Sequence, residues 1–299
     1  MTLGDATPRE HRLAVAGGDL CWFEWGTPSL DRSSLLLVHA TGFHARCWDA
    51  VVAALPPGTH VIAPDLRGHG RSYRPESLGH WGETGDDLVP LIDMLTPGIR
   101  IIAVGHSMGG VCIVRAAAVR PDHFVRLILI DPVIFAPDFY VEAGDHSLGD
   151  AADHFVARRR NHWASASEMA KRFAARFPYS AWDRQVLADY ANHGLVPRAD
   201  GDGLELACPP QLEASAYMGS AAFNPLAAAA MLTCPVTVLR ARNGERQGAL
   251  DFSISPTWPA LATAFPNGRD VQWNDCTHFI PMEAPARLAN FIMTETGLV

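Results

Sequence analysis

The chain has 299 residues, of which 48% are hydrophobic and 19% charged, and this length and composition suit one or two globular domains with a sizeable core. Its formal net charge of −8, from 24 basic and 32 acidic residues, argues against nucleic acid or an anionic membrane as the main partner. Residues 1–11 contain no apolar signal-peptide region, and no apolar run reaches the ~18 residues of a membrane span. We therefore expect a cytoplasmic protein, as a monomer or a homodimer.

The cysteines indicate neither a metal site nor a redox motif. No Cys-x-x-Cys pair occurs, and no other cluster of ligand residues suggests a metal or cofactor. We expect those in apolar runs to act as small buried hydrophobic residues. The six cysteines are Cys21, Cys47, Cys112, Cys208, Cys234 and Cys276.

The predicted elements begin with a hairpin, in which residues 11–16 and 20–25 form two short strands around residues 17–19, Gly-Gly-Asp. Continuous apolar runs typical of strands buried on both faces follow at 35–38, 61–63, 101–104, 127–130 and 236–239, with a weaker one at 271–273. Helical patterns fall between them at about 47–55, 84–95, 108–119, 256–264 and 284–295. This alternation predicts an α/β fold with a mostly parallel sheet and helices on both faces.

The alternation stops after residues 127–130 and resumes at 236–239. The roughly 100 residues between these strands are too many for a single crossover. They contain helical patterns and no convincing strand. We therefore expect a core formed by residues 1–132 and 233–299, with a helical cap inserted at 133–232.

One helix of the expected cap has a clear start. Ser165 is followed three residues later by Glu168, which is the pattern of a capping box. The apolar residues Met169, Phe173 and Phe177 follow at intervals of four, which predicts one face of a helix.

The pentapeptide at 105–109, Gly-His-Ser-Met-Gly, lies between the strand at 101–104 and a helical run at 111–119. Strand, Gly-x-Ser-x-Gly and helix in this order form the pattern of a nucleophile elbow, in which a tight turn holds the serine hydroxyl at its tip. A glycine-rich turn that merely contains a serine is the alternative. The neighbouring strand ends decide between the two.

Other chemically useful groups also follow predicted strands, at the carboxyl ends where parallel sheets carry their sites. Residues 39–42, His-Ala-Thr-Gly, follow the strand at 35–38, and Asp131 follows the strand at 127–130. Two longer loops follow the strands at 61–63 and 271–273. They are residues 65–72, Asp-Leu-Arg-Gly-His-Gly-Arg-Ser, and residues 277–285, Thr-His-Phe-Ile-Pro-Met-Glu-Ala-Pro.

Four of these motifs, in this order and over nearly the whole chain, resemble those of the α/β-hydrolase superfamily. Residues 39–42 are similar to its His-Gly oxyanion loop, with Ala40 where glycine is usual. Residues 65–72, 105–110 and 277–285 are similar to its Asp-x-Arg-Gly-x-Gly-x-Ser turn, its nucleophile elbow and its catalytic-histidine loop. The resemblance implies an α/β-hydrolase fold with an eight-stranded, mostly parallel sheet and an inserted helical cap.

A serine hydroxyl is a weak nucleophile that needs a base within hydrogen-bond reach. Histidine suits this role because its pKa lies near the working pH. We expect His278 to be the base for Ser107, because it follows the last strand and its loop resembles the catalytic-histidine loop of the family. We interpret His39, His69 and His106 as scaffold residues that satisfy backbone groups of the loops.

Two backbone N–H groups are expected to stabilise an oxyanion. One belongs to Met108, the residue after the nucleophile. The resemblance implies that the other comes from the loop after the strand at 35–38, and we assign it to Thr41.

The acid that orients His278 has three candidates. Most relatives place it just after the strand at 236–239, where this chain has Gly244 with Glu245 one residue further, and Asp251 lies at a plausible spacing from the histidine. A minority, including haloalkane dehalogenases and zearalenone-type lactonases, place it after the preceding strand, where Asp131 lies. We put Asp131 first, with Asp251 and Glu245 as alternatives.

A serine nucleophile excludes the aspartate-based chemistries of this superfamily, so we expect acyl transfer to water without metal or cofactor. The substrate is expected to be a small or medium hydrophobic ester or lactone. C–C bond hydrolysis of a β-diketone is an alternative, as is a non-catalytic small-molecule receptor on the same fold. Most cap aromatics are expected to form the cap core, and a few to line an apolar pocket. They are Phe155, Trp163, Phe173, Phe177, Tyr179, Trp182, Tyr190, Tyr217 and Phe223.

Overall fold

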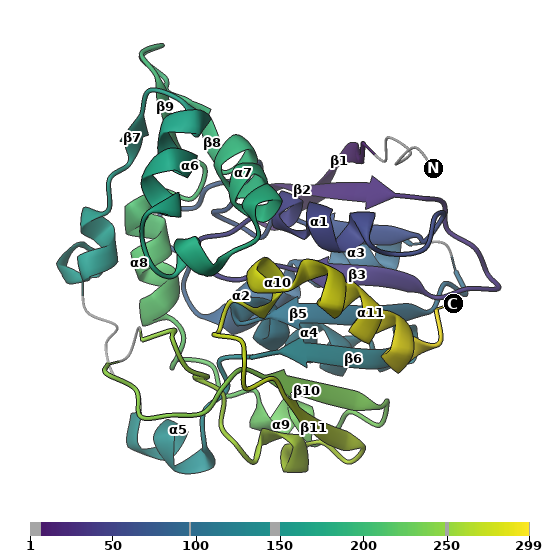
Figure 1. The fold of residues 1–299 in the computed structure, drawn as a ribbon. Coiled ribbons are helices and arrows are strands. Elements are labelled where there is room, and N and C mark those ends of the chain that lie inside the picture. Colours follow the sequence, from purple (N-terminus) through teal and green to yellow (C-terminus); the bar gives the residue numbers. More distant parts are fainter. Residues whose placement is uncertain (1–6, 96, 144–149, 249–250, 299) are drawn as a thin grey trace.

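The computed structural model describes residues 7–95, 97–143, 150–248 and 251–298. Its central sheet has eight strands in the order β1-β2-β4-β3-β5-β6-β10-β11 (Figure 1). The pairs β1–β2 and β2–β4 are antiparallel and the other pairs are parallel, so the expected mostly parallel sheet is confirmed. The strands are β1 (Arg9–Val15), β2 (Gly18–Trp25), β3 (Ser34–Val38), β4 (Val61–Pro64), β5 (Ile101–His106), β6 (Phe124–Ile130), β10 (Val236–Arg240) and β11 (Gly268–Gln272).

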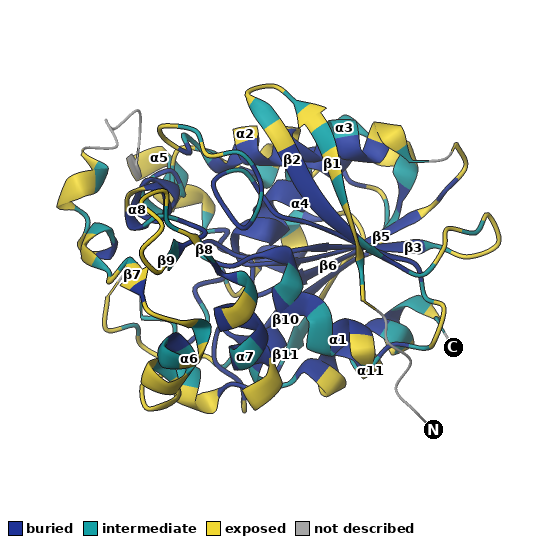
Figure 2. Ribbon diagram, turned by 90° about the horizontal axis from the view of Figure 1, so that it is seen from above, coloured by how far each residue is buried: buried dark blue, intermediate teal, exposed yellow. Residues whose placement is uncertain are grey.

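Helices cover both faces of this sheet (Figure 2). One face packs against α2 (Trp81–Asp86), α3 (Leu88–Met94), α4 (Met108–Val119) and α9 (Leu226–Ala229). The other face packs against α1 (Asp49–Ala53) and α11 (Pro285–Thr296), which α10 (Ile280–Glu283) precedes. None of the helices in the described part of the chain has the length and apolar character needed to span a bilayer.

The strand β3 illustrates why the central strands are apolar throughout. Its side chains alternate between the two faces, as the backbone of a strand requires. Leu36 and Val38 join the cluster under α4, whereas Leu35 and Leu37 join the cluster under α11. Because helices cover both faces, a polar side chain at any of these positions would lose its contact with water, so both sets are apolar.

We use "inserted segment" for residues 133–232, between β6 and β10. It lies at one end of the sheet, away from both termini (Figure 1). One of its helices, α9, packs against α4 of the core. The rest of the segment is grouped at the end of the sheet that lies away from the termini. Its other elements are helices α5 (Pro137–Ala143), α6 (Ala166–Ala174), α7 (Arg184–His193) and α8 (Pro210–Met218), and 3₁₀ turns at Ala151–Asp153, Phe155–Arg158 and Tyr179–Ala181.

The expectation that this segment contains no strand is wrong. A small antiparallel sheet, in the order β7-β9-β8, is formed by β7 (His162–Trp163), β8 (Leu195–Pro197) and β9 (Leu204–Leu206). These strands have only two or three residues each, which is too short to display an alternating pattern in the sequence.

Two helical predictions are also corrected. The stretch 256–264 contains only a 3₁₀ turn at Leu261–Ala264, because Pro256 and Pro259 cannot supply the N–H groups of a helix. Helix α6 begins at its predicted capping box but ends at Ala174, so Phe177 lies beyond it and is 56% exposed. Pro178 disfavours the helical conformation at the residue before it.

Candidate active site

Ser107 occupies the turn between β5 and α4. Its backbone has φ 55° and ψ −119°, a strained conformation for a residue with a side chain. A Cβ atom at Gly105 would lie 2.6 Å from the carbonyl oxygen of Gly109, and one at Gly109 would lie 2.3 Å from that of Val38. Only glycine fits these positions, so the turn has the strand–turn–helix geometry of a nucleophile elbow.

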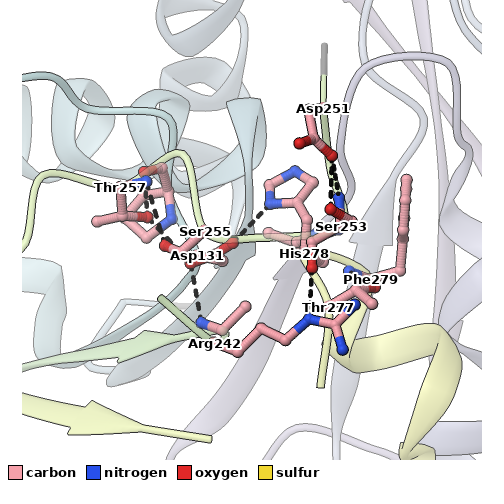
Figure 3. A network of polar contacts seen from close by, with 12 residues as sticks. Asp131, Arg242, Asp251, Ser253, Ser255, Thr257, Thr277, His278 and Phe279 are labelled. Atoms are coloured by element: carbon pink, nitrogen blue, oxygen red, sulfur yellow. Dashed lines mark hydrogen bonds and ion pairs between the residues drawn. The ribbon is translucent and has the colours of Figure 1, made fainter. Parts of the chain in front are cut away.

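His278 lies in the loop between β11 and α10, and Asp131 lies at the end of β6. The ring Nδ1 of His278 is 2.7 Å from Oδ2 of Asp131 (Figure 3). The other oxygen of Asp131 accepts hydrogen bonds from the Ala241 N–H at 3.0 Å, from Thr257 Oγ1 at 3.2 Å and from Ser255 Oγ. Both oxygens of the carboxylate thus have partners. The residue is also completely buried.

Electrostatics favour the ionised form of Asp131. Burial alone raises the pKa of a carboxyl group, but the hydrogen bond and charge of His278, with the bonds from Ser255 and Ala241, lower the pKa of Asp131 overall. An ionised Asp131 accepts the Nδ1–H of His278. In the neutral ring, Nε2 is then left unprotonated and able to accept a proton.

Among the described residues, neither alternative acid forms a hydrogen bond with His278. The carboxylate of Asp251 accepts hydrogen bonds from the Gln247 N–H at 2.8 Å and from the N–H and hydroxyl of Ser253 at 3.0 and 2.6 Å. It therefore stabilises its own loop. Glu245 is exposed. Of the three candidates, the structure brings only Asp131 into contact with His278.

His106, which precedes Ser107 in the chain, contacts His278 and so brings the two residues near each other. The rings of His106 and His278 are 4.9 Å apart, and Nε2 of His106 donates to the carbonyl oxygen of His278 at 2.8 Å. Between the described residues Ser107 and His278 the structure has no hydrogen bond. In unliganded sites this contact is often long, and it shortens when substrate binds.

Two backbone N–H groups beside Ser107 have no acceptor among the described residues, those of Thr41 and Met108. The Thr41 hydroxyl donates to the Met108 sulfur at 3.3 Å, so the two loops are in contact. Met108 is also the first residue of α4, and the N-terminus of a helix favours negative charge. The pair can donate to an anionic oxygen near Ser107.

The other histidines at this end of the sheet hold the loops, as the scaffold interpretation expects. His39 donates to the carbonyl oxygen of Ala40 at 2.7 Å and accepts from the Leu66 N–H at 2.9 Å. His69 accepts from the Gly42 N–H at 3.0 Å. Burial lowers the pKa of His69 to about 4 and that of His39 well below its usual value, so both rings are neutral.

A pocket of about 980 Å³ opens beside Ser107. This volume lies at the upper end of ordinary small-molecule sites. The charged side chains of Arg246 and Asp251 contribute to an otherwise mainly apolar lining. Its aromatic residues come from the inserted segment, the core and the loop after β10: Trp81, Phe135, Phe139, Phe155, Tyr217 and Phe252.

Of the cap aromatics named from the sequence, Phe155 and Tyr217 line this pocket. Most of the others pack together inside the inserted segment, as expected. Sequence reasoning missed Ser255 and Thr257, which bind Asp131, and Phe252, whose ring stacks on His278 at 4.8 Å. No motif marks these three residues in the sequence.

One group of side chains in the described residues could hold a metal ion: Asp49, Asp189 and His193, whose ligand atoms lie within 4.8 Å of one another. None of the three lines the pocket. Both oxygens of Asp49 already accept hydrogen bonds from Arg46, at 2.6 to 2.9 Å. Asp189 accepts a hydrogen bond from the Gln185 side chain at 2.8 Å, so both carboxylates already have protein partners.

Comparison with curated proteins finds two similar enzymes of Mycobacterium tuberculosis. The chain is 32% identical to the esterase Rv0045c over 139 residues, which cover 46% of this chain and 45% of that protein. It is 35% identical to the lipase LipV over 102 residues, which cover 33% of this chain and 37% of that protein. The chain thus matches less than half the length of each of these relatives.

Comparison with solved structures extends over nearly the whole chain. The thioesterase domain from the curacin biosynthetic pathway matches with a TM-score of 0.75 at 21% identity, covering 96% of this chain and 99% of that chain. The solved structure of the Rv0045c esterase matches with a TM-score of 0.68 at 19% identity, covering 96% and 91%. At these identities the matches show a shared fold.

The family comparison agrees with the fold and with the strand-end motifs. A model described as the alpha/beta hydrolase family matches residues 35–291, which include the loops of Thr41, Ser107, Asp131 and His278. The chain therefore belongs to the alpha/beta hydrolase family.

Proposed function

We propose that this protein is a serine hydrolase that cleaves a hydrophobic carboxylic ester or lactone through an acyl-enzyme. Ser107 is the nucleophile, His278 the base and Asp131 the acid that orients it. The observation that carries the proposal is the 2.7 Å contact between His278 Nδ1 and the buried Asp131 carboxylate, at the same end of the sheet as the strained Ser107 turn. This is the arrangement that a serine nucleophile needs.

In the first half of the reaction, Ser107 Oγ attacks the substrate carbonyl carbon and its proton passes to Nε2 of His278. The carbonyl oxygen becomes an oxyanion, to which the N–H groups of Thr41 and Met108 donate. The intermediate collapses and expels an alkoxide, which takes the proton from His278. For a lactone, the alkoxide stays attached to the acyl group.

In the second half, water attacks the ester formed on Ser107 and gives a proton to His278. The second tetrahedral intermediate releases the carboxylic acid, and Ser107 recovers its proton from the histidine. Asp131 stays ionised throughout and stabilises the imidazolium form of the ring. These side chains and water account for every proton and electron pair in the cycle.

The pocket supports an apolar substrate. Its aromatic lining beside Ser107 favours burial of hydrocarbon surface, at about 25 cal/mol for each Å² of apolar surface. We propose that the inserted segment acts as the cap of this pocket, since Phe155 and Tyr217 line it from that segment. The similarity to an esterase and a lipase agrees with an ester substrate.

The test compares wild type with Ser107→Ala on a panel of p-nitrophenyl esters, lactones and β-diketones. Because the three side chains act as a unit, Ser107→Ala is expected to lose on the order of 10⁶ in kcat on an ester or lactone. Circular dichroism should show an unchanged fold. Equal turnover by the two proteins would contradict the mechanism.

Covalent labelling separates the other candidates. A fluorophosphonate should modify wild type at Ser107 and leave Ser107→Ala unlabelled. Turnover confined to the β-diketones would favour C–C bond hydrolysis. Saturable ligand binding by a folded protein that is never labelled would favour a receptor.

A further inference from the structure

Gly42, the residue after the proposed oxyanion donor Thr41, lies between the core and the inserted segment. On the core side, its N–H donates to Nε2 of His69 at 3.0 Å. On the other side, its carbonyl oxygen accepts from the hydroxyl of Tyr190 at 3.4 Å. A Cβ atom at Gly42 would lie only 2.6 Å from Oε1 of Glu213, and its φ of +77° also favours glycine.

Tyr190 and Glu213 are joined by a third residue of the inserted segment. The guanidinium of Arg159 donates to the Glu213 carboxylate and, at 3.4 Å, to the Tyr190 hydroxyl. Glu213 is only 4% exposed. These residues belong to separate elements, since Arg159 follows the turn at Phe155–Arg158, Tyr190 lies on α7 and Glu213 lies on α8.

In this ion pair Glu213 is buried, whereas the Arg159 side chain is 24% exposed. A pair with a buried charge is not in general a source of net stability, because desolvation offsets the attraction. Such pairs are better attested as devices that fix one geometry. Here, Tyr190 donates to the carbonyl oxygen of Gly42, and the Glu213 carboxylate occupies the space that a side chain at Gly42 would need. The arrangement therefore restricts where the loop that carries Thr41 can lie.

Packing around the next two residues of the same loop points the same way. The ring of Phe43 lies 5.4 Å from that of Tyr190 and 5.6 Å from that of Trp182, both in the inserted segment. The ring of His44 donates from Nε2 to the backbone carbonyl of Tyr190 at 3.1 Å. The inserted segment thus contacts three consecutive residues after Thr41.

We infer that Tyr190, Glu213 and Arg159 clamp Gly42 and thereby hold the oxyanion loop in its reactive position, an inference that rests on the proposed hydrolase function. These three are positioning residues, because they act on the Thr41 N–H through the backbone of Gly42. The clamp makes the inserted segment part of the catalytic geometry as well as a wall of the pocket.

The consequence is a specific kinetic signature. A loop that moves by a fraction of an ångström weakens the hydrogen bond to the oxyanion, which forms only in the transition state. Loss of the clamp should therefore lower kcat and leave KM nearly unchanged. The effect should be smaller than the 10²- to 10³-fold loss caused by removal of an oxyanion donor outright, and we expect about tenfold.

Tyr190→Phe is the first test, because it removes one hydroxyl and leaves the aromatic packing in place. The second is the double variant Arg159→Met/Glu213→Gln, which removes both charges and leaves neither one buried alone. We expect each to lose about tenfold in kcat with KM within about twofold of wild type. Hydrogen–deuterium exchange of the peptide that covers residues 41–44 should be faster in both.

Glu205→Gln is the matched control. Glu205 also joins the inserted segment to the core, through a 2.9 Å ion pair with Arg74, but that pair is partly exposed and does not touch Gly42. It should leave kcat and the exchange of residues 41–44 unchanged. The melting temperature of each variant reports whether the fold is intact.

Each result has a defined meaning. Unchanged kcat in both clamp variants overturns the inference, whether or not exchange is faster, and leaves the hydrolase function standing. A rise in KM with constant kcat also overturns it, because it indicates a role in substrate binding. A wild type that neither hydrolyses nor labels contradicts the proposed function instead, and the exchange comparison still tests whether these residues hold the loop.

Discussion

The core and the inserted segment are built in different ways. The central strands β3, β4, β5 and β10 of the core are buried along their whole length, and two hydrophobic clusters lie between the sheet and its helices. The inserted segment has short elements, and its hydrophobic cluster includes core residues: Ala40, Phe43, Cys47, Phe279 and Met282. The apolar side chains of the inserted segment therefore pack against the core loops that contain Thr41 and His278.

This difference separates two kinds of contribution. The core positions the proposed reacting groups, because Ser107, Asp131 and His278 all follow its strands. The inserted segment supplies part of the pocket and, through Gly42, a contact with the oxyanion loop. Substitutions of these three core residues should thus change kcat, whereas those in the pocket lining of the segment should change KM.

The largest expected effect lies in the core. Asp131→Asn keeps the shape of the side chain but removes the charge that orients His278, and we expect a loss on the order of 10⁴ in kcat on an activated ester. Asp251→Asn and Glu245→Gln are the comparisons, and both should lose far less kcat than Asp131→Asn, since neither carboxylate is bonded to His278. A variant of Asp251 that loses more activity than Asp131→Asn would assign the acid to the loop after β10.

An intermediate effect concerns stability against acid. Burial lowers the pKa of His44 and of His106 to about 3 from an ordinary value of 6.5. Between about pH 6 and 4 the unfolded chain therefore binds protons at these rings that the folded protein does not bind. Each ring should then cost about 1.4 kcal/mol of unfolding free energy for every pH unit of acidification.

Asp65 acts with the opposite sign. Burial raises its pKa to about 6, so on acidification the folded protein binds this proton before the unfolded chain does, and stability is gained. Urea unfolding from pH 7 to 4 measures the balance. His44→Gln should flatten the decline in stability and Asp65→Asn should steepen it. A decline that neither variant changes would contradict this assignment.

The smallest effect belongs to the pocket lining of the inserted segment. Phe155 lines the pocket and is 57% exposed, so Phe155→Ala removes apolar contact with substrate at little cost to folding. We expect KM for the most apolar ester of the panel to rise about fivefold with kcat unchanged. Phe177→Ala is the matched control, since this residue is 56% exposed in the same segment but is absent from the pocket lining.

Much of the core was predictable because its rules are local. The hairpin, the buried parallel strands and the Gly-x-Ser-x-Gly turn each follow from neighbouring residues. The carboxyl ends of parallel strands also lie at one edge of the sheet, so the sequence alone predicts that Ser107, Asp131 and His278 lie near one another. The pairing in the inserted segment was missed, because strands such as His162–Trp163 are too short to carry a pattern.

The sequence by itself determined the fold family, the turn that holds Ser107 and the loops that surround it. Only the tertiary structure decided which carboxylate contacts His278, because the residues that bind Asp131 lie far along the chain. Ala241, Ser255 and His278 are 110, 124 and 147 residues away from it. The hydrogen bond from Tyr190 to Gly42, and the packing of Glu213 where a side chain at Gly42 would lie, likewise join distant segments, which no local pattern can indicate.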